Sequence, residues 1–246
     1  MKVYWLEQTE ADVPAENDWL SANEALCLKG MRFVKRRTDW RLGRWTAKRT
    51  LSVCLDVPAH PQVFRKMDIR PAPDGAPEAF FDNQSAAVTI SLTHRAGIAV
   101  CAVTECGVEM GCDLEMVEPR SDAFVADYFT LEEQALVARA SAVDRPRLLA
   151  LLWSAKESAL KALRAGLRLD TRCVTVSPFP ASYDLNGWSR LLVRYTGGHR
   201  TGGEVFHGWW QHTNNILRTV VAAPPPDSPI PLTILAHFFD SASRCA

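Results

Sequence analysis

Apolar residues recur every three or four positions within residues 148–166. They are Leu149, Leu152, Ala155, Ala159 and Ala162. This spacing predicts a helix with one buried face that ends near Gly166, a residue type that tolerates positive φ. Beside that face, Trp153, Glu157 and Lys161 follow at four-residue intervals, so an acid and an amine lie in line along the helix. Taken alone, this is an ordinary surface Glu–Lys pair worth about 0.2–0.5 kcal/mol.

Upstream of that helix the pattern changes to the alternation that is typical of strands. The alternating runs are residues 88–94, 98–104 and 109–115. The first two runs flank Arg95-Ala-Gly97 and predict a hairpin. The third carries Asp113 and Glu115 on one face, about 7 Å apart. Two such acids repel each other unless they are solvated or share a cation, and a solvated strand end is the simpler interpretation.

Helix-start signals and further alternating runs complete the predicted elements. Ser21 with Glu24, and Thr130 with Glu133, are capping boxes that each open a helix. Downstream, the predicted strands are residues 173–177, 191–195, 206–210 and 217–223. Residues 56–87 are rich in Pro, Ala, Asp and Gly, with a turn-rich loop predicted at residues 72–77, and regular structure is expected to resume at Ala87.

Helices precede strands in residues 20–115 and again in residues 120–223. This order predicts an α+β fold of two similar α/β subdomains related by pseudo-twofold symmetry. We expect residues 1–110 to form the N-terminal subdomain and residues 111–246 the C-terminal one, with the active site at their interface. Because two such halves would supply the whole interface, we expect a monomer.

Charge is balanced over the chain as a whole but not along it. Lys and Arg together number 28, as do Asp and Glu, so no overall field draws the protein to nucleic acid or to an anionic membrane. Residues 29–49 nevertheless hold nine Lys or Arg against one acid, Asp39. A stripe at helical spacing consists of Arg37, Arg41, Arg44 and Lys48. Such a stripe is either a solvated helix face or a site for a phosphate-bearing ligand.

The chain has the features of a cytoplasmic protein. No apolar run approaches the roughly 18 residues of a membrane span, and acids from Glu7 onward replace the apolar part of a signal peptide. Seven cysteines without the paired spacing of a zinc site indicate reduced thiols that pack as small buried side chains.

Motifs in the second half resemble those of a known family. Gly111-Cys-Asp-Leu-Glu115 matches G-[IV]-D-[IVL]-E except at its cysteine, and Tyr128-Phe-Thr-Leu-Glu-Glu133 is similar to F-[FS]-x-x-E. Trp153-Ser-Ala-Lys-Glu-Ser-Ala-Leu-Lys161 matches W-[ST]-x-K-E-[AS]-x-x-K at every position. The chain therefore resembles the 4′-phosphopantetheinyl transferases of the larger, surfactin-synthetase-activating type.

The first half carries looser matches to the same family. Ile90-Ser-Leu-Thr-His-Arg-Ala-Gly97 resembles N-[IL]-S-H-S-x-G with threonine in place of a serine, and Leu42-Gly43-Arg44 resembles the end of the family's arginine-rich helix. Ala76, between Gly75 and Pro77, stands where the family usually has Lys or Arg. The likeness extends over residues 30–223 and puts one phosphate or substrate contact, the one at position 76, in question.

The resemblance implies an activity and a set of ligands. Coenzyme A would bind between the two halves, a serine of an apo acyl or peptidyl carrier protein would attack the phosphorus next to pantetheine, and 3′,5′-ADP would leave. Mg²⁺, or alternatively Mn²⁺, would be held by Asp113, Glu115 and Glu157. The carriers could serve fatty-acid, polyketide or nonribosomal peptide synthesis.

The resemblance also implies roles for single residues. Glu157, directly or through a metal-bound water, is the first candidate for the base, and Glu133 is the second. Lys156 and Lys161 would contact the phosphates, with Lys161 meeting charge that develops during transfer. The predicted contacts to the 3′-phosphate are Arg44, Lys48, Thr93 and His94. A histidine satisfied by nearby backbone is the competing interpretation of His94.

Two other classes of protein share part of this pattern. Another Mg²⁺-dependent nucleotide or polyphosphate transferase would use the same acids without accepting a carrier protein. A non-catalytic polyanion-binding module would use residues 29–49 and would need no acids.

Overall fold

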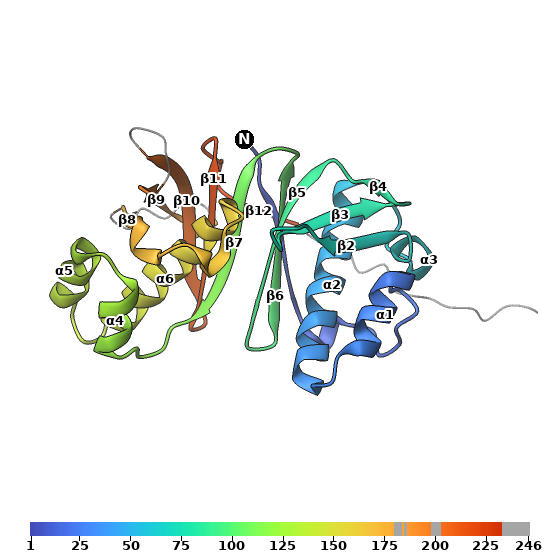
Figure 1. Cartoon of the computed structure of the whole chain (residues 1–246), viewed down its shortest axis with the longest axis horizontal. Coiled ribbons are helices and arrows are strands. Elements are labelled where there is room, and N and C mark those ends of the chain that lie inside the picture. Colours follow the sequence, from blue (N-terminus) through green and yellow to red (C-terminus); the bar gives the residue numbers. More distant parts are fainter. Residues whose placement is uncertain (180–183, 185, 198–202, 233–246) are drawn as a thin grey trace, which may run out of the picture.

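The computed structural model describes residues 1–179, 184, 186–197 and 203–232, which form a mixed α/β structure. Two sheets lie beside each other, each with one long helix packed on a face (Figure 1). None of the described helices combines the length and the apolar character that a membrane crossing requires.

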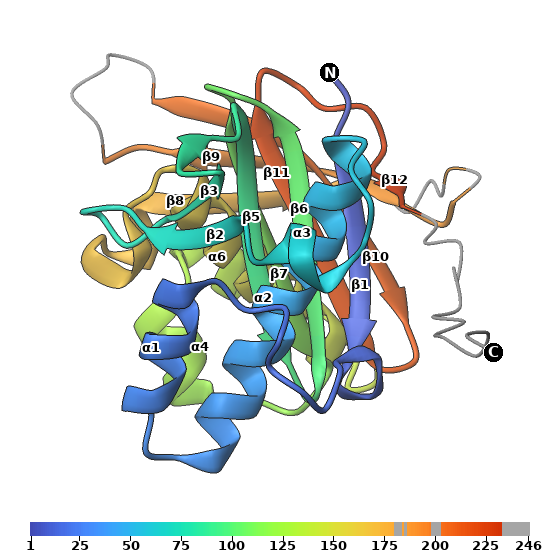
Figure 2. The same ribbon diagram turned by 90° about the vertical axis from the view of Figure 1, so that its right-hand side faces the viewer.

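The first sheet has the strand order β12-β1-β6-β5, and a separate small sheet has the order β2-β3-β4. The elements of this half are β1 (Tyr4–Thr9), α1 (Ala22–Gly30), α2 (Val34–Cys54), α3 (Pro61–Phe64), β2 (Met67–Pro71), β3 (Pro77–Phe81), β4 (Gln84–Ser85), β5 (Val88–Arg95) and β6 (Ile98–Glu105). Figure 2 shows α1, α2 and α3 in front of β1, β5 and β6. Helix α2 packs on these three strands through an apolar core that includes Trp45 and Leu51.

The second sheet has the order β7-β11-β10-β9-β8, with every neighbouring pair antiparallel. Its half contains β7 (Glu109–Met116), α4 (Asp122–Tyr128), α5 (Leu131–Arg139), α6 (Arg145–Ala162), β8 (Val174–Pro178), β9 (Ser189–Tyr195), β10 (Glu204–Thr213) and β11 (Ile216–Ala223). The last strand, β12 (Ile230–Pro231), returns to the first sheet and pairs in parallel with β1.

Most of the predicted elements are confirmed. The hairpin is β5–β6, both capping boxes open helices, and the four downstream strands are β8 to β11. The loop predicted at residues 72–77 is confirmed as the turn between β2 and β3, but the expectation that regular structure resumes only at Ala87 is wrong, because β2, β3 and β4 form a sheet within residues 67–85. Helix α6 also begins earlier than predicted, at Arg145, and ends at Ala162 before Arg164 takes a positive φ of 54°.

The cysteine prediction is only partly confirmed. Cys101 and Cys112 are buried, whereas Cys27, Cys54 and Cys106 are exposed. The structure records the six described cysteines as free thiols, so within the described chain none forms a disulfide.

The two halves meet through an apolar cluster of their own, to which β1, β6, β7, β10 and β11 all contribute. On the other face of β7, helix α6 approaches very closely at Gly111. A Cβ on that residue would lie 1.9 Å from the Ser158 carbonyl oxygen, so only glycine permits this spacing. Ser154 and Ser158 both contact the Thr219 hydroxyl of β11, at 2.8 and 2.7 Å, which fixes the same helix face on the sheet.

Candidate active site

The closest group of predicted site residues lies where β7, β5 and α6 meet. Lys161 donates to one carboxylate oxygen of Asp113 at 2.8 Å and to the Cys112 carbonyl at 3.0 Å. Thr93 of β5 donates to the same Asp113 oxygen at 3.1 Å. The threonine comes from the first half and the acid and amine from the second, so the site is built across their junction.

Glu157 stands one turn before Lys161 on α6, in the same electrostatic environment. Burial raises its pKa to about 7, and the charges of Asp113 and Glu115 act in the same direction, while Lys161 opposes them. Burial alone would lower the pKa of Lys161, but Asp113 and Glu157 raise it above its ordinary value. The amine therefore stays charged between two acids.

Two carboxylate oxygens in this group are buried and receive no hydrogen bond within the described structure, Oδ2 of Asp113 and Oε1 of Glu157. Oxygen atoms of this kind are the ligands that Mg²⁺ prefers, so their chemistry fits a divalent cation. Glu115 instead points one oxygen at Arg120, 3.3 Å away, and lies 3.8 Å from Arg95. Accordingly, no three His, Cys, Asp or Glu side chains among the described residues are already grouped as a metal site.

His94 lies in a different environment, next to the start of α2. A cavity of about 490 Å³ is lined by Phe33, Lys35, Arg36, Asp39, Trp40 and His94. Burial lowers the pKa of His94, and the charges of Lys161 and Lys35 lower it further against the pull of Asp39. The sequence prediction included His94 but missed Lys35 and Arg36, which belong to the same basic segment as the predicted stripe.

The stripe itself faces inward and tethers α2 to neighbouring backbone. Arg37 donates to the carbonyls of Leu28 and Met31, both at 3.4 Å. Arg41 donates to three carbonyls of residues 14–16. Arg44 lies over the Trp40 ring, 4.9 Å from its centroid, with Nε 3.8 Å from Glu24. None of the four residues of the stripe lines the 490 Å³ cavity, and Arg44 contacts Trp40, which does.

Lys48 of α2 is completely buried, and its ammonium has three oxygen partners. They are the carboxylate of Glu24 and the carbonyls of Trp19 and Phe64. An ammonium has three N–H donors, so Lys48 keeps none for a coenzyme A phosphate.

Lys156 of α6 is enclosed in the same way. Its ammonium lies 2.8 Å from the Glu133 carboxylate and donates to the carbonyls of Thr171 and Val174. Glu133 is 1% exposed, so neither residue of this pair has an atom available to a phosphate or to a serine hydroxyl. Sequence reasoning counted both as site residues because a sequence shows charge and does not show burial.

A larger cavity of about 740 Å³ separates β3 and β5 of the first half from the β6–β7 turn and the end of α6. Lys161 lines it and so connects it with the acids. Ala76 and Arg164 also line it, and Arg164, two residues after the end of α6, pairs with Asp74 at 2.6 Å and Glu78 at 2.9 Å. The loop around position 76 therefore has a cation beside it, but one that two acids already neutralise.

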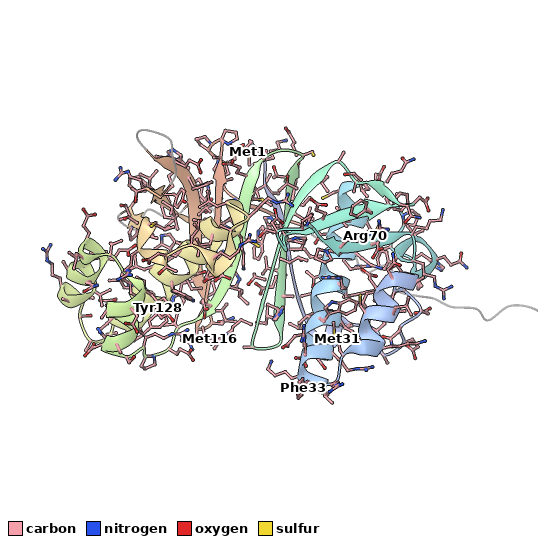
Figure 3. The ribbon with its side chains drawn as sticks, in the orientation of Figure 1. Met1, Met31, Phe33, Arg70, Met116 and Tyr128 are labelled. Carbon is pink, nitrogen blue, oxygen red and sulfur yellow. The ribbon has the colours of Figure 1, made fainter. Side chains whose placement is uncertain are left out.

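Each half has an exposed aromatic side chain at one end of a helix. Phe33 at the start of α2 is 72% exposed and Tyr128 at the end of α4 is 38% exposed. Figure 3 labels both, and both lie on the lower side of the view, as does Met116, the last residue of β7.

Comparison with known families gives one match. Residues 109–193 match the model of the 4′-phosphopantetheinyl transferase superfamily. The matched segment runs from the start of β7 into β9 and contains Asp113, Glu157 and Lys161. No curated protein matches the chain.

Proposed function

We propose that the protein transfers the 4′-phosphopantetheine group of coenzyme A to a serine of an apo acyl or peptidyl carrier protein, with release of 3′,5′-ADP. The observation that carries this proposal is the group formed by Asp113, Lys161 and Glu157, since it lies inside the segment that matches the superfamily. A non-catalytic polyanion-binding module would have no use for buried acids whose oxygens lack hydrogen-bond donors.

A divalent cation, Mg²⁺ or Mn²⁺, suits the acids of this group. Asp113 and Glu157 would hold it, because each has a buried oxygen without a donor, and Glu115 is the weaker third ligand because Arg120 and Arg95 already pair with it. When bound, such a cation would neutralise part of the charge on the pyrophosphate of coenzyme A.

The protein's own groups have separate tasks in this proposal. Lys161 would bind a phosphate oxygen next to the reacting phosphorus, where negative charge develops. Glu157 would accept the proton of the carrier serine, since a pKa of about 7 suits a base at neutral pH. Glu133 is left out as a base, and Lys48 and Lys156 as phosphate ligands, because all three are buried in ion pairs.

The 490 Å³ cavity suits the 3′-phosphate end of coenzyme A. Lys35, Arg36 and His94 line it, with Lys35 also paired to Asp39 at 2.9 Å, and charge-assisted hydrogen bonds from such groups are the usual means of binding phosphate. The charge of Lys161 lowers the pKa of His94, so this cavity lies near the acid group. Thr93 and His94 are successive residues of β5 and point to opposite faces of the sheet, so a ligand with phosphates at two positions would reach both by passing around this strand.

We further propose that the halves, residues 1–110 and 111–246, are subdomains related by a pseudo-twofold axis. A repeated pattern supports this: Trp45-Thr-Ala-Lys-Arg-Thr50 in α2 resembles Trp153-Ser-Ala-Lys-Glu-Ser158 in α6, and Asp18-Trp-Leu-Ser-Ala-Asn-Glu24 resembles Asp127-Tyr-Phe-Thr-Leu-Glu-Glu133. Each pattern occurs in the same order in its half. A monomer in the cytoplasm is the state we expect for the working enzyme.

Mass spectrometry of intact carrier proteins tests the activity. With coenzyme A and Mg²⁺, an apo carrier should gain one phosphopantetheine group, and the protein with Asp113→Asn should give no gain. Fatty-acid, polyketide and nonribosomal peptide carriers should all be tried. If none of them is modified, the proposed function is wrong.

A further inference from the structure

Each half contains a buried pair of glutamate and lysine that joins several elements. We call Glu24 with Lys48 the α2 clasp and Glu133 with Lys156 the α6 clasp. The glutamate is in both cases the third helical residue of a capping box, and its second oxygen accepts a backbone N–H from a strand. That strand donor is Ile69 of β2 in the α2 clasp, at 3.3 Å.

The α6 clasp has the same construction with tighter geometry. Glu133 accepts from Thr130 N and from Val176 N of β8, both at 2.8 Å. One carboxylate thus ties the start of α5 to β8, and its lysine ties both to the middle of α6. A long helix held at a side chain in its middle cannot turn about its axis or slide without breaking buried charge contacts.

The residue after the α6 clasp lysine is Glu157, one step of about 100° around the helix. The opposite side of α6 is held by Gly111 and by the hydroxyl contacts to Thr219. With the clasp on one side and the sheet on the other, α6 has a single rotation that points Glu157 at Asp113. The α6 clasp therefore controls the acid group without touching it.

The α2 clasp acts on another part of the site. Arg44 precedes Lys48 by one helical turn and shares Glu24 with it, so the same carboxylate orients both cations. Arg44 in turn lies over Trp40, which lines the 490 Å³ cavity together with His94. A displaced α2 would move this cavity and leave the acids of the second half in place.

We propose that the two clasps are positioning devices with separate tasks. The α6 clasp sets Glu157 for the chemical step, and the α2 clasp sets the cavity that binds the 3′-phosphate of coenzyme A. Lys48, Lys156, Glu24 and Glu133 are accordingly positioning residues that touch no ligand. This inference rests on the proposed function, and it predicts that the two pairs affect different kinetic constants.

The test replaces each pair by neutral side chains of similar length, Lys48→Met with Glu24→Gln and Lys156→Met with Glu133→Gln. Replacing both members avoids leaving a lone buried charge. The exposed pair Lys66 and Asp82, changed to Met and Asn, is the matched control. For each protein, kcat, KM for coenzyme A and binding of 3′,5′-ADP by calorimetry are measured below the melting temperature.

Loss of the α6 clasp should lower kcat by about tenfold or more while leaving the affinity for 3′,5′-ADP unchanged. Loss of the α2 clasp should weaken 3′,5′-ADP binding and raise KM by about tenfold, and should reduce the preference for coenzyme A over dephospho-coenzyme A. The control should match the wild type in all three measurements. Binding of 3′,5′-ADP measures the state of the cavity independently of catalysis.

Equal changes in kcat and in 3′,5′-ADP affinity for both clasp variants, or no change in either, would overturn the proposal, because a purely structural pair has no reason to divide its effects. If a double variant does not fold, Glu24→Gln and Glu133→Gln alone should give the same division at smaller size. A wild-type protein that binds 3′,5′-ADP but modifies no carrier would contradict the proposed function, and the division of binding effects would still decide the role of the α2 clasp.

Discussion

Helices α2 and α6 share a buried frame and differ in the residue that follows the buried lysine. In α2 that residue is Arg49, which lies over the Trp45 ring, 5.8 Å from its centroid, and is attracted by Asp12. In α6 it is Glu157, among Asp113, Glu115 and Lys161. The shared residues anchor a helix on a sheet in both halves. In our proposal, the residue that differs gives only the second half a chemical function.

The halves also divide the site between them. The first supplies Thr93 and the basic cavity around His94, and the second supplies the acids and Lys161. Binding of an anionic end and chemistry at a phosphorus thus belong to different halves in our proposal. Variants at equivalent positions of α2 and α6 test whether binding and chemistry are divided in this way.

The largest difference should come from the residues that differ. Asp113→Ala or Glu157→Ala should abolish carrier modification, since each removes a proposed metal ligand, whereas Arg49→Ala, at the equivalent position of α2, should leave the rate close to that of the wild type. Glu115→Ala should be milder, because water can replace one ligand of a hydrated cation. Initial rates from intact-protein mass spectra measure this. Near-normal rates for Asp113→Ala at saturating Mg²⁺ would show that the acids were assigned incorrectly.

The shared residues should instead contribute to stability in both halves. Lys156→Met leaves the buried Glu133 carboxylate without its cation, which should lower the free energy of unfolding by about 3–5 kcal/mol. Lys48→Met should cost somewhat less, because Arg44 remains 3.8 Å from Glu24. Adding Glu24→Gln or Glu133→Gln to the matching single variant should recover much of the loss. Urea denaturation of all the variants measures it. A loss below about 1 kcal/mol, the range of an exposed ion pair, would mean that the clasps contribute little.

His94 tests the first half separately from the second. A charge-assisted bond to the 3′-phosphate is worth about 1.5–3 kcal/mol, so His94→Ala should lower kcat/KM for coenzyme A by about ten- to a hundredfold. Dephospho-coenzyme A lacks that phosphate, and its kcat/KM should hardly change. Both substrates are measured with both proteins as a double-mutant cycle. Equal losses would assign His94 to the fold or the chemistry.

The last test concerns pH and stability in the absence of metal. The pKa of Glu157 is raised from 4.5 to about 7 in the folded protein, so the folded state holds this proton more tightly than the unfolded chain. Its contribution to stability is greatest below pH 4.5 and is lost as the pH rises through about 7. Glu157→Gln should therefore raise the melting temperature at pH 8 and leave it nearly unchanged at pH 4.5. Arg49→Gln should show no such dependence on pH, and an unchanged melting temperature for Glu157→Gln at pH 8 would contradict the raised pKa.

Local sequence patterns predicted the positions of helices and strands better than the roles of the charged residues. Alternation located β7 to β11, and Ser21 and Thr130 located two helix starts, because these signals depend on neighbours in sequence. The roles of Lys48, Lys156 and Glu133 depend on burial, which is set by packing between distant segments. Charged residues are almost never fully buried unless paired, and their partners lie in other helices. The repeated W-[ST]-A-K pattern was the available signal.

The same limit explains the errors around the basic segment. Arg37 and Arg41 have the spacing of a stripe, but the carbonyls that receive them belong to residues 14–16, Leu28 and Met31, whose position no local pattern gives. The cavity is lined by Lys35 and Arg36 of the same basic segment. The sequence does not show that these two face the cavity whereas Arg37 and Arg41 face backbone carbonyls.

The absence of a side chain at Gly111 sets the distance between β7 and α6. A Cβ at this position would lie 1.9 Å from Ser158 O. The strand that carries Asp113 and the helix that carries Glu157 can therefore lie this close only because the glycine side chain is a hydrogen atom. An alanine at position 111 would push the strand and the helix apart, and with them the two acids. Among homologues, we expect this position to vary less than the acids themselves, and an engineer who redesigns the catalytic chemistry should leave it alone.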